Sequence, residues 1–394
     1  MSLAYVGVKG GMVIVSADDP GPISSQTEQD TRRFADFCRI PVFDPSSPEE
    51  AYKMIGEAFE YSEKYNTPVL FRPTTRVCHA YASIDNCDSP SPKKYEGFVK
   101  DSKKWVIFPR LSFANHIMIE KRNVEIGKDF STYSANKAEG VNSEKAVVTS
   151  GISYAYTKEC LKDYPDVKLI KIATAYPFPE DFVLSSLEGA KEVLCIEELS
   201  PFIEEQILKL TGKHGLQLKV SGKLDGKVQA GGENSTDKIA AILGDFLGKD
   251  FTAEGYDLSD APALPVRPPV LCAGCPHRAS FYAVKQAMKG RKAYFCGDIG
   301  CYTLGNAMPL DMVDTCLCMG AGITMAQGFN HTDSDGVCFG FVGDSTFFAS
   351  GITGVVNAVH NNADMILCVL DNSTTAMTGH QSHPGLDNNL GTDS

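Results

Sequence analysis

Two residues with oxygen-bearing side chains, Asp344 and Asn372, stand just after two apolar runs of the sequence. The runs, residues 337–342 and 365–370, each predict a buried strand because they are short, apolar and bounded by turn-forming residues. Between them, apolar residues recur at helical spacing and predict a helix that begins near Phe347. A right-handed strand–helix–strand crossover brings the ends of both strands to one edge of a sheet. We therefore expect the two side chains to lie close together.

Such a pair of oxygens suits a Mg²⁺ ion that carries a diphosphate. Mg²⁺ prefers near-octahedral oxygen ligands and usually keeps phosphate oxygens among them. The N-terminus of the predicted helix would point at the same anion, and Gly343 would let the backbone turn tightly beside it. The alternative is an ordinary α/β turn in which Asp344 only caps the helix.

Three cysteines form a second candidate site. Cys272 and Cys275 make a C-x-x-C turn, and Cys301 follows a predicted helix, 278–288, and a predicted strand, 293–296. Iron–sulfur clusters and structural zinc ions take four ligands, typically thiolates, so a fourth ligand would have to come from elsewhere. A redox pair of Cys272 with Cys275, or simple packing, are the alternatives.

Composition narrows the class of protein. With 394 residues the chain is long enough for two to four domains, and 43% hydrophobic and 22% charged residues are typical of a soluble globular protein. A net charge of −12 argues against nucleic acid as a partner. We find no apolar run near the roughly 20 residues that span a bilayer, and no secretory pattern. The 13 cysteines are then expected to be reduced, and the protein cytoplasmic, with Cys195 and Cys368 as small buried side chains.

The first part of the chain predicts part of an α/β domain. Residues 1–5 resemble the last turns of a helix and precede a strand at 12–16, so we expect the chain to begin inside a domain. A polar loop at 18–30 is either substrate-facing or simply solvated. An amphipathic helix at 49–65, capped by Ser47, leads to a strand at 69–72.

The middle of the chain has a looser region and then a regular one. Residues 80–137 have no clear period and include a linker-like stretch at 89–94. Strands and helices then alternate, which predicts a compact α/β domain; we place strands at 146–150, 167–172 and 192–196, and helices at 153–161, 180–187 and 201–211. Glu197 and Glu198 fit a helix start or a surface feature better than a catalytic pair. Residues 222–232 predict a loop, and the prolines of 262–269 a linker before the last domain.

The motifs together resemble a known family. GDS followed by DN is similar to the thiamine diphosphate fingerprint, usually GDG and NN, with Ser345 in place of the third glycine and Asp371 in place of the first asparagine. The segments CAGCPHR, GDIGCYTLG and DTCLCMGAGI, with SADDPGPISSQTEQDTR near the start, complete the match. The chain thus resembles, over nearly its whole length, the large subunit of 2-oxoacid:ferredoxin oxidoreductases of the indolepyruvate branch.

The resemblance implies specific site residues. Asp344, Asn372 and the backbone carbonyl of Thr374 would bind Mg²⁺. The residues expected to bind or line the cofactor are Gly300, Cys301, Gly320, Gly343, Asp344, Ser345, Asn372 and Thr374. Cys318 and Met319 would lie near its ring. In related members, cysteines at the positions of Cys272, Cys275 and Cys301 hold a [4Fe–4S] cluster. His380 stands where the family usually has glycine.

The resemblance also implies an architecture: an α/β, multi-domain thiamine diphosphate-binding fold with parallel sheets flanked by helices. Its parts would be the second half of a pyrimidine-binding domain (1–80), a linker region (81–140), a transketolase-C-like α/β domain (141–255) and a truncated diphosphate- and Mg²⁺-binding domain (262–394). The glutamate that activates the cofactor is expected upstream of Met1. A ferredoxin-like domain that carries most of the [4Fe–4S] clusters is expected after Ser394.

The implied activity is the oxidative decarboxylation of arylpyruvates to aryl-acetyl-coenzyme A and CO₂. Electrons would pass through iron–sulfur clusters to ferredoxin, and a small beta subunit would complete a hetero-oligomer; neither nucleic acid nor a membrane is expected as a partner. This chain alone is expected to be inactive. The rivals are a non-oxidative thiamine diphosphate-dependent decarboxylase or synthase, and a zinc-stabilised α/β binding module.

Overall fold

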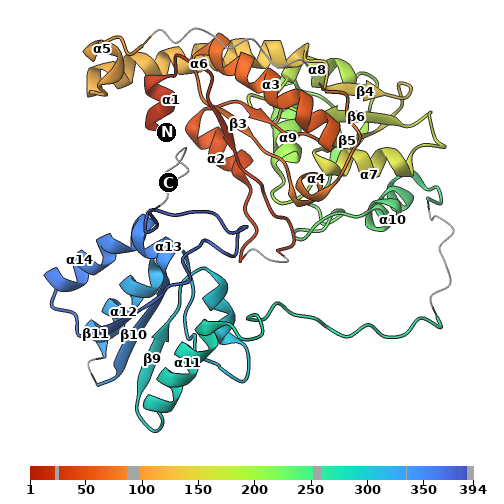
Figure 1. Cartoon of the computed structure of the whole chain (residues 1–394). Coiled ribbons are helices and arrows are strands. Elements are labelled where there is room, and N and C mark those ends of the chain that lie inside the picture. The colour runs from red at the N-terminus through yellow and green to blue at the C-terminus, as the bar shows by residue number, and fades with distance from the viewer. Residues whose placement is uncertain (23–25, 87–96, 252–258, 334, 388–394) are drawn as a thin grey trace. The chain divides into compact units, whose positions relative to one another are not determined.

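The computed structural model describes residues 1–22, 26–86, 97–251, 259–333 and 335–387. The chain folds into two compact units, Met1–Tyr256 and Asp257–Ser394 (Figure 1). No helix in the described ranges has the length and apolar character needed to cross a membrane. The predicted stretch at 89–94 lies outside the described residues, and residues 259–270 are exposed and contain neither helix nor strand, as expected for a linker.

The first unit begins with a small parallel sheet of order β1-β3-β2. Its longest helix, α3, starts where the sequence predicts a cap: the Ser47 side chain accepts the backbone N–H of Glu50, and Pro48 occupies the first turn. The strands are β1 (Val13–Val15), β2 (Val42–Phe43) and β3 (Val69–Phe71), and the helices are α1 (Ser2–Val6), α2 (Thr31–Cys38), α3 (Pro48–Tyr65) and α4 (Thr75–His79).

A five-stranded sheet of order β4-β6-β5-β7-β8 forms the rest of this unit, and only its edge strand β4 runs antiparallel. The central strands are buried on both faces, which explains their continuous apolar runs. The strands are β4 (Lys137–Glu139), β5 (Lys145–Ser150), β6 (Lys168–Ile172), β7 (Glu192–Ile196) and β8 (Lys219–Ser221), and the helices are α7 (Ile152–Cys160), α8 (Glu180–Ser186), α9 (Phe202–His214) and α10 (Thr236–Leu247). The predicted alternation of strands and helices is confirmed.

The region expected to be a linker, 81–140, contains a helix of 23 residues, α6 (Pro109–Ser131), preceded by the short α5 (Ser102–Trp105). Ile126 and Phe130 of α6 are fully buried and pack in one core with Phe43 of the first sheet. The backbone N–H of Val42 also donates to the carbonyl of Tyr176, which joins the two sheets. The sequence did not predict this helix, because only a few of its turns carry core residues and the helical periodicity of its apolar residues is therefore weak.

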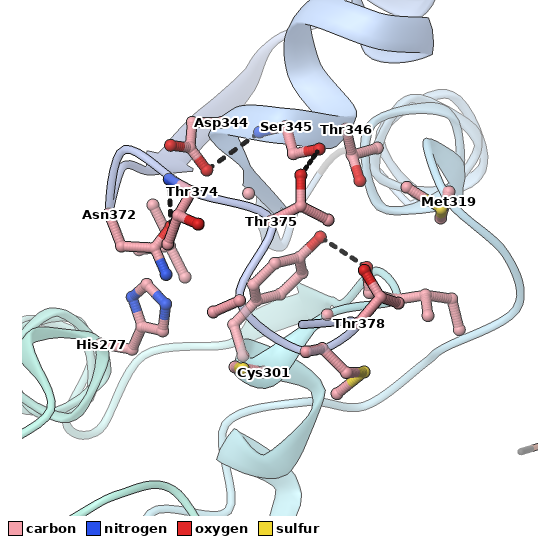
Figure 2. A pocket seen from close by; sticks show the side chains of 17 residues that line it. His277, Cys301, Met319, Asp344, Ser345, Thr346, Asn372, Thr374, Thr375 and Thr378 are labelled. Carbon is pink, nitrogen blue, oxygen red and sulfur yellow. Dashed lines mark hydrogen bonds between the residues drawn. The ribbon is translucent and has the colours of Figure 1, made fainter. Parts of the chain in front are cut away.

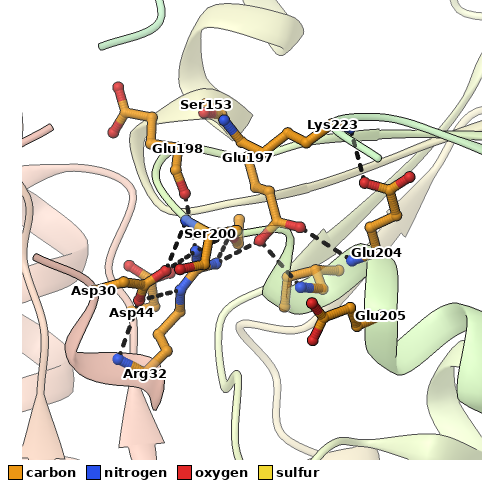
Figure 3. Close-up of polar contacts among 12 residues, drawn as sticks. Asp30, Arg32, Asp44, Ser153, Glu197, Glu198, Ser200, Glu204, Glu205 and Lys223 are labelled. Carbon is orange, nitrogen blue, oxygen red and sulfur yellow. Dashed lines mark hydrogen bonds and ion pairs between the residues drawn. The ribbon is translucent and has the colours of Figure 1, made fainter. Parts of the chain in front are cut away.

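Buried charges connect the loop after β1 with the end of β7 (Figure 3). Arg32, with no exposed side-chain surface, pairs with Asp30 and Glu197, each at 2.7 Å. Glu197 also accepts the backbone N–H groups of Ile203 and Glu204, so it caps the first turn of α9 as a helix-start residue. The helix-start interpretation is therefore confirmed for Glu197, whose charge is buried beside the arginine, whereas Glu198 is buried as well and is not a surface feature.

Arg72 forms a second buried group of the same kind. Its guanidinium lies 2.6 Å from the carboxylate of Asp18 and 3.2 Å from that of Asp44. Asp18 is fully buried and the side chain of Asp30 is 5% exposed, although they bound a loop for which the sequence suggested a substrate-facing or solvated position.

The second unit contains a parallel sheet of order β11-β10-β9. The predicted strands at 293–296 and 365–370 are confirmed to the residue, and β10 extends one residue further, to Gly343. The strands are β9 (Ala293–Cys296), β10 (Val337–Gly343) and β11 (Met365–Leu370); the helices are α11 (Pro276–Ala287), the 3-10 turn η1 (Cys301–Asn306), α12 (Ala321–Thr332), α13 (Asp344–Thr346), the π-helical turn η2 (Phe347–Gly351) and α14 (Ile352–His360).

The helix predicted after β10 is present, but its large apolar residues face outward. Gly351, Gly354 and Ala358 are buried, and an added Cβ on either glycine would lie 3.2 Å from Ile323 of α12. Small residues thus let α14 approach α12 closely. The larger ones at the predicted helical spacing are 42–72% exposed; they are Phe348, Ile352, Val356 and Val359.

Candidate functional site

A pocket opens in the second unit where β10 and β11 end (Figure 2). Its walls come from the start of α13, from the turn that follows β11, from residues 299–302 and from His277 of α11. The predicted pair, Asp344 and Asn372, both line this pocket. The crossover geometry therefore brings the two strand ends to one cavity, as expected.

Asp344 is the first residue of α13, so the helix begins three residues before the predicted position near Phe347. The residue is 2% exposed, and Oδ1 accepts the backbone N–H of Ser345 at 2.9 Å. The helix then passes through a π-helical turn, Phe347–Gly351, before it continues as α14. Such turns are frequent at functional sites, because they shift side chains around the helix axis.

The turn after β11 is shaped by its own polar side chains. Asp371 accepts the backbone N–H of Ser373 at 2.8 Å, and Asn372 Oδ1 accepts that of Thr374 at 3.4 Å. Ser373 has φ of 56°, in the left-handed region. The Ser373 N–H and a contact with Asp344 lower the pKa of Asp371. Two carboxylates and an amide oxygen thus gather at the mouth of the pocket.

A hydroxyl pair joins the two strand ends. Thr375 Oγ1 donates to Ser345 Oγ over 2.7 Å (Figure 2). Ser345 is the residue that replaces the third glycine of the fingerprint, so this bond depends on the departure from the usual motif.

Tyr302 explains two of the predicted glycines. An added Cβ would lie 2.4 Å from its ring at Gly300 and 2.6 Å from it at Gly343. Gly343 has φ of −76°, which any residue can adopt, so space for the ring, rather than a tight turn, explains why this position is glycine. Tyr302 donates its hydroxyl to the carbonyl of Ile299 and is 5% exposed, and burial raises its pKa.

Asp298 fixes the loop that precedes α12. It has no exposed surface, and its Oδ1 accepts the backbone N–H of Gly320 at 2.8 Å. Burial raises the pKa of Asp298. Gly320, predicted to bind the cofactor, here serves this loop and has φ of 92°, whereas the neighbouring Met319 lines the pocket; Cys318 is exposed.

The three cysteines lie near one another. Burial raises the pKa of Cys301, and the nearby Cys272 and Cys275 raise it further. Cys301 lines the pocket, whereas Cys272 is exposed. In the part of the chain that the structure describes, however, no three His, Cys, Asp or Glu side chains are arranged to hold a metal ion.

Sequence reasoning missed several residues of this site. His277, Tyr302 and Thr375 line the pocket, and His383 contacts Asp344. Burial lowers the pKa of His277, while the charge of Asp344 acts in the opposite direction. His277 stands two residues after Cys275, in C-P-H-R, and this closeness to the cysteine turn was the sequence signal that could have identified it as a site residue.

A known protein family matches the C-terminal part of the chain. Residues 298–394 match the family model described as thiamine pyrophosphate enzyme, C-terminal TPP binding domain. That range includes Asp298, both strand ends and the turn after β11.

The curated relatives cover almost the whole chain. It is 40% identical over 395 residues to the indolepyruvate oxidoreductase subunit IorA of Methanothermobacter thermautotrophicus, with 98% of this chain and 63% of that protein covered. The subunit IorA of Thermococcus kodakarensis is 36% identical over 412 residues, with 98% and 63% covered. The chain therefore spans about 63% of the length of these relatives.

Among solved structures, 2-oxoglutarate:ferredoxin oxidoreductase from Magnetococcus marinus aligns with a TM-score of 0.42 and 14% identity, over 62% of this chain and 50% of that one. A likeness of this size supports no functional inference. The sequence relatives and the family model carry the assignment: the chain is a relative of the indolepyruvate oxidoreductase subunit IorA, and its residues 298–394 match a thiamine pyrophosphate-binding domain.

Proposed function

We propose that this chain holds the diphosphate end of thiamine diphosphate, through Mg²⁺, in an enzyme that oxidatively decarboxylates arylpyruvates of the indolepyruvate type. One observation carries the proposal. Asp344 and Asn372, at the ends of neighbouring parallel strands, line one pocket within the segment that matches the thiamine pyrophosphate-binding family.

The residues present fit a hydrated divalent cation. Asp344 and Asn372 supply side-chain oxygens, and the backbone carbonyl of Thr374 is the third proposed ligand; Mg²⁺ accepts such a set together with phosphate oxygens. Asp371, whose pKa is lowered, adds a negative charge beside them. The first turn of the helix that begins at Asp344 offers backbone N–H groups to an anion in the same pocket.

Thiamine diphosphate, when bound, supplies the carbon that adds to the keto group and stores the electrons left by departing CO₂. The chain's own residues would bind and orient it. Gly343 and Ser345 would border the diphosphate, with Gly300, Cys301 and Met319 along the opposite wall. The buried Tyr302 would close the floor and exclude water.

We propose that a [4Fe–4S] cluster accepts the electrons released by the decarboxylation. Its ligands would be Cys272, Cys275 and Cys301, with a fourth ligand from another segment. Cys275 and Cys301 pack against the same hydrophobic core, which supports their proximity. The name of the relatives, indolepyruvate oxidoreductase subunit IorA, supports an indolepyruvate substrate. Coenzyme A as acyl acceptor, ferredoxin as electron acceptor, a small beta subunit and a cytoplasmic location complete the proposal.

The exposed stripe on α14 supports association with another subunit. Ile352, Val356 and Val359 of α14 are 45–72% exposed, and Phe348 of the preceding π-helical turn is 42% exposed, which is unusual for a surface that faces only water. We keep the division into parts at 1–80, 81–140, 141–255 and 262–394 as a further proposal; the cores that join the first three parts indicate that they fold together.

Calorimetric titration with thiamine diphosphate, with and without Mg²⁺, tests the centre of the proposal. We expect Mg²⁺-dependent binding, and we expect Asp344→Ala to weaken it at least about 100-fold, because a ligand carboxylate is lost. Asp335→Ala, at an exposed position of the same unit, is the control. Equal binding by Asp344→Ala and the parent protein would refute the Mg²⁺ assignment.

Metal analysis after anaerobic purification tests the cysteines. We expect iron with labile sulfide, and loss of both in Cys275→Ser. Zinc instead would indicate a zinc-stabilised binding module, and neither metal would favour a non-oxidative decarboxylase.

A further inference from the structure

His383 contacts the carboxylate at the centre of the site from a distant part of the chain. Its Nε2 lies 3.1 Å from Asp344 Oδ2, across 39 residues of sequence. The two side chains are only 3% and 4% exposed. This contact is therefore an interior one, made by the segment that follows β11.

The other ring nitrogen fixes which atom carries the proton. His383 Nδ1 lies 3.1 Å from the backbone nitrogen of Gly385, whose N–H donates to it. Because a protonated nitrogen accepts no hydrogen bond, Nδ1 is the bare nitrogen and Nε2 bears the hydrogen. Nε2–H therefore donates to Asp344.

The position of the imidazole is itself supported. Its ring stacks on Phe348, with centroids 6.3 Å apart and planes 15° from parallel. At Gly385 an added Cβ would lie 2.2 Å from the Phe348 ring, so only glycine lets the backbone come this close. The segment is thus shaped to bring one N–H to one carboxylate oxygen.

Asp344 is consequently held at both oxygens. The backbone N–H of Ser345 donates to Oδ1 at 2.9 Å, and His383 donates to Oδ2 at 3.1 Å. Each oxygen keeps a lone pair for a cation, while rotation of the carboxylate would break both bonds. Groups that orient a metal ligand in this way typically change metal affinity about 10- to 100-fold when they are removed.

We propose that His383 is a positioning residue that holds the Asp344 carboxylate in the orientation needed to bind the cation of the diphosphate. This inference rests on the proposed function and assigns a role to a residue outside the predicted ligand set. The competing explanation is that His383 only fastens the segment 379–385 to α13 and contributes stability alone.

Two substitutions separate these roles, because each keeps one half of the imidazole. In His383→Gln the side-chain amide nitrogen can take the place of Nε2 and donate to Asp344. In His383→Asn the shorter side chain can accept the Gly385 N–H in place of Nδ1 but does not reach the carboxylate. Both variants lose the stack on Phe348, so each controls for the packing change in the other.

Two quantities are measured for each variant. The first is the affinity for Mn²⁺ in the presence of thiamine diphosphate, determined from the electron paramagnetic resonance signal of the ion. The second is the melting temperature of the protein without Mn²⁺ and without thiamine diphosphate. We expect His383→Asn to weaken Mn²⁺ binding about 10-fold or more and His383→Gln to remain within about 3-fold of the parent, at similar melting temperatures. Equal affinities in both variants, whether parent-like or equally weakened, would overturn the inference. If His383→Asn does not fold, His383→Gln decides alone: a loss of about 10-fold or more would refute the positioning role. Failure of the parent protein to bind Mn²⁺ with thiamine diphosphate would instead refute the proposed function.

Discussion

At the residue scale, the carboxyl group of Glu198 accepts the backbone N–H of Asn234 at 2.8 Å, and the residue is 5% exposed. Burial raises its pKa from 4.5 to about 7. Between these values the folded state binds a proton that the unfolded chain does not hold. The free energy of unfolding therefore falls as pH rises through this window, by at most about 3 kcal/mol.

Glu198→Gln should remove this pH dependence, since the amide oxygen can still accept the Asn234 N–H without carrying a charge. We expect a higher melting temperature than that of the parent at pH 8, and a smaller difference at pH 5, measured by scanning calorimetry. Glu188→Gln, at an exposed position of the same unit, is the control. A melting temperature at pH 8 that is unchanged or lower would contradict the burial argument.

His380 allows a second residue-scale prediction. Its φ of 63° lies in the left-handed region, which costs energy for a residue that carries a side chain. His380→Gly should relieve this strain and leave the backbone bond from residue 380 to the Thr375 carbonyl intact. Glycine also makes the unfolded chain more flexible, which offsets part of the relieved strain. We therefore expect the free energy of unfolding, measured by chemical denaturation, to rise by about 0.5–1 kcal/mol. A loss of stability would mean that the imidazole makes a contact worth more than the strain.

The sequence predicted those site residues whose position follows from strand topology. Asp344 and Asn372 each stand next to an apolar run, so the crossover rule alone brings them together. His277 lines the pocket from a helix start and His383 contacts Asp344 from a turn, and their positions depend on packing around Tyr302 and Phe348. That information is three-dimensional and has no sequence period.

At the element scale, the strands were predictable because glycine and aspartate end their apolar runs abruptly. Which face of α14 is buried was not predictable, because its larger apolar residues were expected to form the buried face. Its glycines instead determine the contact with Ile323 of α12. Close packing of a backbone against a neighbour favours the smallest side chain over the most hydrophobic one.

Two glycines of α12 give a matched test of close packing. An added Cβ at Gly322 would lie 2.6 Å from the carbonyl oxygen of Phe341 and 3.1 Å from that of Cys296, and neither backbone can move freely. Gly322→Ala should push α12 away from the sheet and destabilise the second unit by about 1–3 kcal/mol. Gly328→Ala, which meets no atom within 4 Å, should stabilise the same helix by about 0.5–1 kcal/mol. Denaturation that ranks the two variants in the opposite order would contradict this packing.

At the scale of the whole molecule, the prediction of an α/β protein with parallel sheets is confirmed. The expected linker at 81–140 differs most, since α6 completes a core with both sheets of the first unit. The burial of α6 depends on where the two sheets lie, and its weak helical periodicity does not reveal this burial in the sequence.

The apolar stripe on α14 bears on how the molecule associates. Val356 is 64% exposed and Val359 is 72% exposed on a helix whose buried side is made of glycine and alanine. If another subunit covers the stripe, a charge placed there would lose its water on association at a cost of several kcal/mol. Val356→Glu should therefore shift sedimentation toward the smaller species by about tenfold or more in dissociation constant, with the melting temperature of the separated chain unchanged. Asn357→Glu, also exposed but outside the stripe, should leave association unaltered. Identical sedimentation of both variants and the parent would mean that the stripe faces solvent and that subunits meet through another surface.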